Sequence, residues 1–368
     1  YVETPDTFSA GDVPDWVTDW LGRRRKTSGA AKAEQPSGAG KSLSLARAEE
    51  PEKPEDPAAV ARREAAAKKR AEETEATLLG AMDDLETWIE DQLRTGLSAL
   101  LTDLHTRCRA IAARMVDGKA GALASRIDEI PGRILSLPGE ERLDALIAQL
   151  GKLVILTRGF RADPKAPDIR RAVATSENRE DVLGNPDALR VKSLWEVAGE
   201  RVTTRRDNMV SHATWLLNLK DDGPRFALLL DFFPAATGRR STAFTPGGQF
   251  EAELVFYPGR APLRARVGQR GTCPPPARPE PTQTPHDDAA NIETALPWSE
   301  LAPVLLPSGR IAFDGKRAWW CAGDGGLTLP LDVAPPDALT GMTLDKTSAL
   351  WDGARLSVLS AQTRWGGV

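Results

Sequence analysis

Histidine and cysteine are both scarce in this chain, with three of each among 368 residues. Cys108, Cys273 and Cys321 are odd in number and widely spaced, which argues against a disulfide framework and favours a reducing cytoplasm. No two of the cysteines are close in sequence, so they do not form the ligand pattern of a zinc finger. We therefore expect a cytoplasmic protein whose present chain binds no metal and needs no cofactor.

Long apolar runs and a secretory signal are missing as well. No apolar run reaches the roughly 18 residues needed to cross a bilayer, so we expect no membrane contact. The missing initiator methionine suggests that the chain begins inside a longer gene product. A net charge of −4 gives no general attraction to nucleic acid. With 41% hydrophobic and 27% charged residues, the composition predicts a globular protein of about two or three domains.

The common hydrolase motifs, G-x-S-x-G and H-E-x-x-H, do not occur. Ser211 and His212 are adjacent on a predicted strand, so their side chains point to opposite faces and cannot form a nucleophile–base pair. Asp231 interrupts the run "LLLDFFP", where a turn role at the end of a strand is favoured over a catalytic one. We expect a protein that is not an enzyme.

Two further patterns suggest a ligand site but lack the required setting. His286, Asp287 and Asp288 stand together, yet their Pro-rich surroundings offer no rigid scaffold for metal ligands. Gly40-Lys41-Ser42 resembles the end of a phosphate-binding loop, but Gln35 replaces its first glycine and no apolar strand precedes it. The second pattern is interpreted as part of a flexible linker.

A short helix is predicted in the first segment, residues 1–25. Trp16 and Trp20 lie four residues apart and hence on one face, and the basic residues Arg23, Arg24 and Arg25 suit the negative end of the helix. The tryptophans can pack on the rest of the protein or anchor a partner.

Residues 26–57 are predicted to be a linker, and residues 58–185 a helical bundle. The first helix of the bundle is Ala-rich and solvated, and it carries a basic cluster composed of Arg62, Arg63, Lys68, Lys69 and Arg70. This cluster is either a wet face or a site of partner or nucleic-acid contact. A stripe of apolar residues from Leu78 to Met115 then predicts one long core-facing helix, with Gly96 as the place for a bend. Further helices are expected at about 119–135 and 139–160, with Leu143 and Ile147 in the buried stripe of the latter.

Near residue 190 the apolar period changes from helical to two. Residues 186–272 predict an antiparallel meander with one buried face that can close into a barrel. Its alternating faces include Trp215 with Leu217, and Phe226 with Leu228, Leu230 and Phe232. Residues 273–290 are a predicted Pro-rich linker. Residues 291–368 contain two hairpins that turn at Asp-Gly and pack on the sheet. The fold class is α+β, because helices precede strands rather than alternating with them.

Four longer strings resemble bacterial SWIM-type zinc-finger proteins: "VPDWVTDWLGRR", "ARMVDGKAGALASRI", "TWLLNLKDDGPRFALLLDFFP" and "FEAELVFYPGRAPLRARV". They occur in the family's order and extend over nearly the whole chain. The first looks like the segment that directly follows the zinc finger. The family's zinc ligands, C-x-C followed by C-x-H, are not in this chain, so no ligand is assigned to any residue here.

The resemblance implies a full-length protein that binds zinc upstream of Tyr1 and contacts protein or nucleic-acid partners. An AAA-type ATPase or a von Willebrand A protein is the implied kind of protein partner. The resemblance favours a non-catalytic adaptor. The alternatives are a DNA-binding protein that uses the basic clusters with the upstream finger, and an enzyme with an unrecognised site in the β domain.

Overall fold

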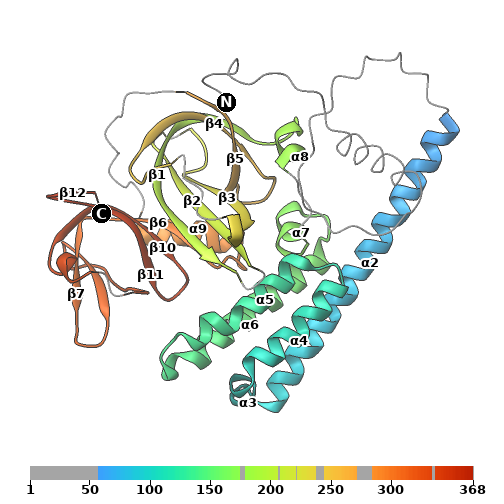
Figure 1. Cartoon of the computed structure of the whole chain (residues 1–368), viewed down its shortest axis with the longest axis horizontal. Helices are drawn as coiled ribbons and strands as arrows, with labels where there is room; N and C mark the ends of the chain where they lie inside the picture. The colour runs from blue at the N-terminus through green and yellow to red at the C-terminus, as the bar shows by residue number, and fades with distance from the viewer. Residues whose placement is uncertain are drawn as a thin grey trace, which may run out of the picture. The chain divides into compact units, whose positions relative to one another are not determined.

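The structure is a computed structural model that describes residues 57–174, 179–205, 208–220, 222–237, 244–271, 284–333 and 336–367. Two compact units divide the chain, Tyr1–Arg62 and Arg63–Val368, and nearly all described residues belong to the second. Figure 1 shows helices first and strands second along the chain, which confirms the predicted α+β class. Among the described residues, no helix combines the length and apolar character that crossing a membrane requires.

The helical part begins with α2 and ends with α8. Its α-helices are α2 (Pro57–Thr95), α3 (Leu97–Thr102), α4 (Leu104–Asp117), α5 (Gly121–Leu135), α6 (Arg142–Ala162), α7 (Pro167–Val173) and α8 (Arg179–Gly184). A short 3₁₀ turn, η2 (Gly139–Glu141), precedes α6. The helices predicted at 119–135 and 139–160 are thus confirmed as α5 and α6.

The single helix predicted from Leu78 to Met115 is wrong, because the chain reverses within it. Gly96 has a φ of 99°, a left-handed conformation that glycine adopts without strain, and it separates α2 from α3. Beyond the reversal, Arg107 of α4 donates to Gln92 of α2 at 2.6 Å, and Lys119 lies 3.3 Å from Thr74. The apolar stripe continues through the reversal because α2 and α4 run antiparallel and present it to the same core.

That core is continuous through the bundle and includes Leu85, Leu100, Cys108, Met115 and Phe160. Cys108 is buried in it, as predicted for a packed core thiol. The expectation that Leu143 and Ile147 are also buried is wrong, since they are 39% and 50% exposed. The reason is that α6 is apolar on more than one side, and only one side faces the bundle.

The first sheet is a closed ring with the order β1-β2-β3-β5-β4. Its strands are β1 (Arg190–Thr204), β2 (Met209–Asn218), β3 (Phe226–Pro234), β4 (Gln249–Phe256) and β5 (Arg264–Arg270), with a 3₁₀ turn, η3 (Ala235–Thr237), after β3. Neighbours pair antiparallel except β3 and β5, which pair in parallel over Leu228↔Arg264 and Leu229↔Ala265. The closure that the sequence allowed is therefore present.

The prediction of one buried face is wrong for the middle strands. Leu216, Ala227 and Leu229 line the interior of the ring, together with Trp195 and Phe256. Trp215, Leu217 and Phe226 lie on the outer face, where they pack with Leu305 and Leu350 of the second sheet. Phe232, expected inside with Phe226, is exposed. Both faces are apolar because the ring is itself covered by a second sheet, so alternation alone does not separate inside from outside.

The second sheet has the order β12-β11-β10-β7-β8-β9, with β6 also pairing to β10. Its strands are β6 (Ala302–Leu306), β7 (Gly309–Phe313), β8 (Ala318–Ala322), β9 (Thr328–Pro330), β10 (Thr343–Trp351), β11 (Leu356–Thr363) and β12 (Gly366–Gly367), with η4 (Asp337–Leu339) before β10. The two predicted Asp-Gly hairpins are confirmed as β7–β8 and β10–β11. Where the ring meets this sheet, a Cβ on Gly199 would lie 2.6 Å from Leu359 Cβ, so the close approach requires glycine.

The predicted Pro-rich linker, 273–290, ends sooner than expected, because α9 (Pro285–Ala295) begins within it. Thr284 and Asp287 form a reciprocal capping box at its start, which satisfies backbone donors that the first helical turn leaves unpaired. His286, Asp287 and Asp288 therefore stand on a helix, and the expectation that they lack a scaffold is corrected. The earlier residues of this segment lie outside the described ranges.

Candidate functional site

The predicted partner-binding residues divide into two groups. Trp16, Trp20, Arg23, Arg24 and Arg25 lie outside the described residues, as does the Gly40-Lys41-Ser42 motif. The second group, Arg62, Arg63, Lys68, Lys69 and Arg70, lies on α2. The structure therefore describes the surroundings of the second group only.

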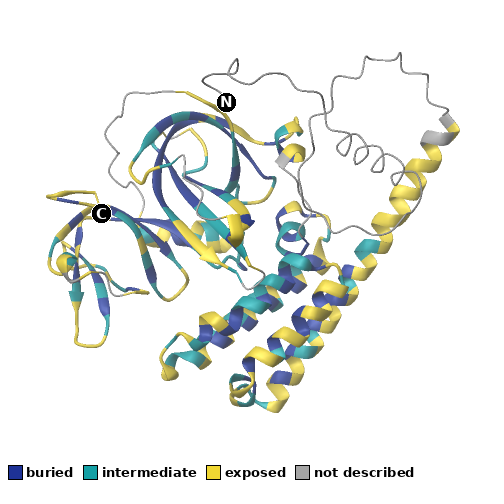
Figure 2. Cartoon of the chain, in the orientation of Figure 1, coloured by how far each residue is buried: buried dark blue, intermediate teal, exposed yellow. Residues whose placement is uncertain are grey.

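All residues from Ala61 to Glu73 are exposed, and the first buried residue of α2 is Leu78. Figure 2 shows this change along one helix, which is exposed over its N-terminal half and partly buried further on. We name residues 61–73 the exposed half of α2. The prediction of a solvated helix is confirmed, while partner binding remains a prediction.

Charge along the exposed half is mixed. Lys68 and Lys69 each lie 4.0 Å from a glutamate one turn further on, Glu72 and Glu73. Arg70 donates through Nε to the carbonyl of Ala66 at 3.1 Å. Such i,i+4 pairs add a few tenths of a kcal/mol each, roughly 0.2–0.5. Together with the high helix propensity of alanine they account for a helix whose side chains are exposed from Ala61 to Glu73.

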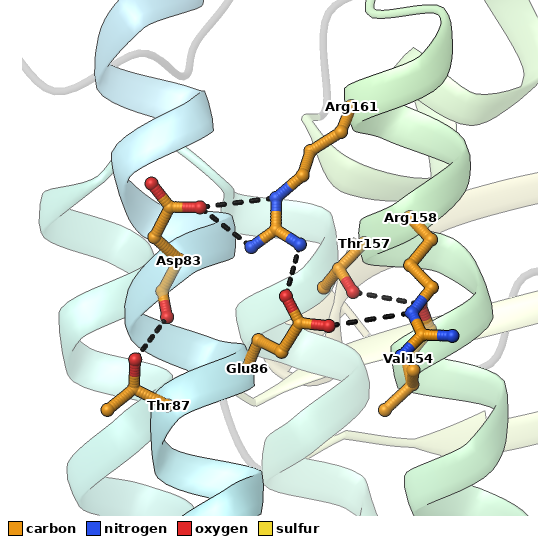
Figure 3. A network of polar contacts seen from close by, with 7 residues as sticks. All are labelled: Asp83, Glu86, Thr87, Val154, Thr157, Arg158 and Arg161. Atoms are coloured by element: carbon orange, nitrogen blue, oxygen red, sulfur yellow. Dashed lines mark hydrogen bonds and ion pairs between the residues drawn. The ribbon is translucent and has the colours of Figure 1, made fainter.

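A cluster of ion pairs fixes α2 to α6 just beyond the exposed half (Figure 3). Arg161 Nη2 lies 2.7 Å from Asp83 Oδ1, and another of its nitrogens pairs with Glu86. Arg158 Nε lies 3.5 Å from the second oxygen of Glu86. The hydrogen bonds that Arg161 donates to Glu86 and Asp83 raise the pKa of Arg161 above its usual value. The exposed half therefore extends from an anchored base.

A second cluster joins the bundle to the strands. Arg126 Nε on α5 lies 2.9 Å from Glu300 Oε1, just before β6, and Arg133 pairs with the same carboxylate. Glu129 accepts from Arg133 at 2.7 Å and lies 3.6 Å from Arg205, just after β1. Burial, with a smaller contribution from neighbouring Arg133, lowers the pKa of Arg126 to about 10.

Further charged contacts continue along the same side of the bundle. Glu141, at the start of α6, pairs with both Arg317 and Arg355 of the second sheet. Lys152 Nζ lies 3.4 Å from the carbonyl oxygen of Asp352, and burial lowers the pKa of Lys152. Bidentate and shared arginine–carboxylate pairs fix orientation as well as distance. The bundle and the strands are thus joined by polar contacts at several points.

The ring carries a row of titratable side chains. His212 Nε2 lies 2.8 Å from Glu200 Oε2 across β1 and β2, and both side chains are mostly buried. Asp231 pairs opposite His212 in the β2–β3 ladder and accepts from Arg266 Nη1 at 2.6 Å. Asp231 therefore lies inside β3, and its assignment to a turn at the strand end is corrected. Ser211, the nearest hydroxyl in sequence to His212, is on the other face of the strand, so the two do not form a nucleophile–base pair.

Asp288 of α9 is deeply buried, although the sequence indicated it only as part of a metal pattern without a scaffold. Its Oδ1 lies 3.0 Å from Arg225 Nε, and its Oδ2 accepts from the backbone N–H of Leu305 at 3.2 Å. Burial outweighs both contacts and raises the pKa of Asp288 to about 6. It connects α9, β6 and the start of β3, which is a structural role. The capping signal at Thr284 and Asp287 is the sequence feature that could have placed it on a helix.

Among the described residues, no group of three or more His, Cys, Asp or Glu side chains is placed to hold a metal ion.

Residues 73–176 match the family model of the SWIM-associated four-helix bundle domain. The matched region begins at the end of the exposed half of α2 and contains the helical core through α7. It confirms the predicted resemblance to the region that follows the finger in SWIM-type proteins. The match covers less than a third of the chain. No curated protein and no solved structure matches.

Proposed function

We propose that this protein is a non-catalytic adaptor of the SWIM type, and that the exposed half of α2 is its partner-binding element. The observation that carries the proposal is the exposure of every side chain from Ala61 to Glu73 on a helix that is continuous with the bundle. The i,i+4 pairs of this helix keep it folded without burial, so its side chains stay accessible to a partner.

The anchored base of the helix supports this proposal. Arg161 with Asp83 and Glu86 holds α2 against α6 where the exposed half ends. The cluster around Arg126 and Glu300 in turn joins the bundle to the strands. A partner held on the exposed half would therefore be connected to the folded body through ordered side chains. A rigid presentation of this kind lowers the entropy that binding must overcome.

The partner is proposed to be a protein, because acidic side chains alternate with the basic ones and the chain's net charge is −4. By family resemblance we propose an AAA-type ATPase or a von Willebrand A protein as its class. Zinc binding is proposed only for a longer polypeptide that contains the C-x-C and C-x-H motif.

The test is affinity capture of the full-length protein from an extract of its own cells, with a charge-reversed variant alongside. The variant carries Lys68→Glu, Lys69→Glu and Arg70→Glu, and a neutral version carries glutamine at the same positions. We expect the variants to lose a partner that the parent retains at moderate salt. Recovery of the same partners by parent and variants, or of none by the parent, would contradict the proposal.

A matched control reverses three exposed lysines elsewhere, Lys165→Glu, Lys220→Glu and Lys316→Glu. It should capture the same partner as the parent, which separates the effect of position from that of net charge. Binding of a short labelled DNA duplex is measured in parallel at increasing salt. Strong, steeply salt-dependent DNA binding that the α2 variant loses would favour the DNA-binding alternative.

A further inference from the structure

The second sheet contains a cavity of about 750 Å³ beside a change of strand partner in β10. Thr343 and Leu344 of β10 pair with β7, whereas Thr347 and later residues pair with β6. The cavity opens between these two pairings. Its volume lies in the range of small-molecule sites, roughly 300–1,000 Å³.

The backbone of β10 is irregular at the same place. Lys346 has a φ of 48°, in the left-handed region that non-glycine residues rarely adopt. The register with β11 also shifts between Asp345 and Ser348, so that β10 has an additional residue there. Bulges of this kind re-aim side chains and are frequent beside functional sites.

Thr347 provides the observation that points to a ligand. It is fully buried, it lines the cavity, and its Oγ1 has no hydrogen-bond partner in the described chain. An isolated buried hydroxyl is unfavourable, and native structures rarely leave one without a partner. A polar group of a molecule in the cavity would satisfy it.

The charge and polarity of the walls define the kind of molecule. Lys346 and Arg364 are cationic and Asp345 is anionic, so the lining carries one net positive charge. Ser308, Thr343 and Gln362 add side-chain donors and acceptors, and Leu305 and Leu306 add apolar surface. Arg364 stacks on the exposed ring of Trp365 with its Cζ 4.5 Å from the ring centroid. The guanidinium of an arginine carries five N–H donors, whose geometry matches a carboxylate or a phosphate.

We propose that this cavity binds a small hydroxylated molecule with one anionic group, a phosphate or a carboxylate. Arg364 and Lys346 hold the anionic group, and Thr347 and its polar neighbours contact the hydroxyl groups. The site is independent of the exposed half of α2.

The experiment measures binding to the whole chain by calorimetry. Three probes separate the two anionic sources from the polyol alone: glucose 6-phosphate, glucuronate and glucose. We expect one of the anionic probes to bind at least about tenfold more tightly than glucose, since hydrogen bonds to a charged group carry that difference. No binding of either anionic probe, or equal binding of glucose, would overturn the proposal.

Two variants locate the site. Arg364→Gln should weaken the anionic probe by about tenfold or more, whereas Lys316→Gln, an exposed lysine of the β7–β8 turn in the same sheet, should not change its affinity. Thr347→Val keeps the side-chain shape and removes the hydroxyl. It should leave the melting temperature of the free protein unchanged or higher, and it should weaken the probe. A lower melting temperature with unchanged probe affinity would show that Thr347 is satisfied by water alone and would overturn its role in the site.

Discussion

Two buried tryptophans, one in the ring and one in the second sheet, differ in whether the indole N–H is hydrogen-bonded. Trp195 in the ring and Trp320 in the second sheet are both fully buried. Trp195 donates through Nε1 to the carbonyl of Ala252 at 3.2 Å, while Trp320 Nε1 has no hydrogen-bond partner in the described chain. Oγ1 of Thr347, also in the second sheet, likewise has no hydrogen-bond partner in the described chain.

The contrast extends to buried hydroxyls. Ser193 on β1 is fully buried, and its Oγ lies 2.7 Å from both Asn218 Oδ1 and Asp222 Oδ1. This network fixes the turn between β2 and β3. Ser193 is therefore a buried hydroxyl within a paired network, which stabilises a scaffold. Thr347 in the second sheet is a buried hydroxyl beside a cavity, and its Oγ1 has no hydrogen-bond partner in the described chain.

Truncation of the two tryptophans should have the largest effect and tests whether the sheets depend on each other. Trp195→Ala and Trp320→Ala should each lower the free energy of unfolding by about 3–5 kcal/mol, because a large core side chain is removed. The ring and the second sheet share the cluster of Trp215, Leu305 and Leu350, so we expect a single urea transition in both variants. Two separated transitions in either variant would show that the sheets fold independently.

The second largest effect is expected from the titration of Asp288, which lies where α9 meets both sheets. It makes the free energy of unfolding depend on pH. Burial raises the pKa of Asp288 in the fold to about 6, well above the usual value of an aspartate, so the folded state holds the proton more tightly than the unfolded state. Stability from this group is therefore present below the unfolded pKa and is lost as pH rises through about 6. The difference corresponds to about 2–3 kcal/mol at neutral pH.

The measurement compares parent and Asp288→Asn by urea unfolding at acid and neutral pH. The asparagine variant keeps the shape but does not titrate, so its stability relative to the parent should improve as pH rises from 4 to 7. Other carboxylates contribute equally to both proteins and cancel. A constant difference between the two proteins across this range would contradict the raised pKa.

Ser193→Ala should have an intermediate effect within the ring. Removing the hydroxyl leaves the oxygens of Asn218 and Asp222 with one donor fewer, which costs roughly 1–3 kcal/mol. The loss should appear in chemical unfolding and as faster hydrogen exchange of the β2–β3 turn. An unchanged stability would mean that the Ser193 network is not what fixes this turn.

The sequence predicted what depends on local period and missed what depends on distant contacts. The apolar stripe from Leu78 to Met115 indicated the bundle core, but it could not show the reversal at Gly96, since both arms carry the same pattern toward the same core. The prediction of which strand face is buried was wrong where neighbouring residues such as Leu216 and Leu217 are both buried, on opposite sides of the strand. The exposed half of α2 was predictable because it has few apolar residues. The pairing of Arg126 with Glu300 was not, because no local signal joins residues so far apart in sequence.

The smallest predicted effect is the difference in unfolding free energy between Trp195→Phe and Trp320→Phe. It directly tests the difference between the two buried tryptophans. Both changes remove similar apolar area, so that contribution cancels in the difference. Trp195→Phe also leaves the carbonyl of Ala252 without its indole donor, whereas Trp320→Phe removes a buried donor that has no partner. The ring variant should therefore lose about 1 kcal/mol more than the second-sheet variant. Urea unfolding of both variants under one condition measures that difference. Equal losses would show that the indole of Trp320 is satisfied by water to the same degree as Trp195 is by Ala252, and the contrast between the two sheets would then rest on Thr347 alone.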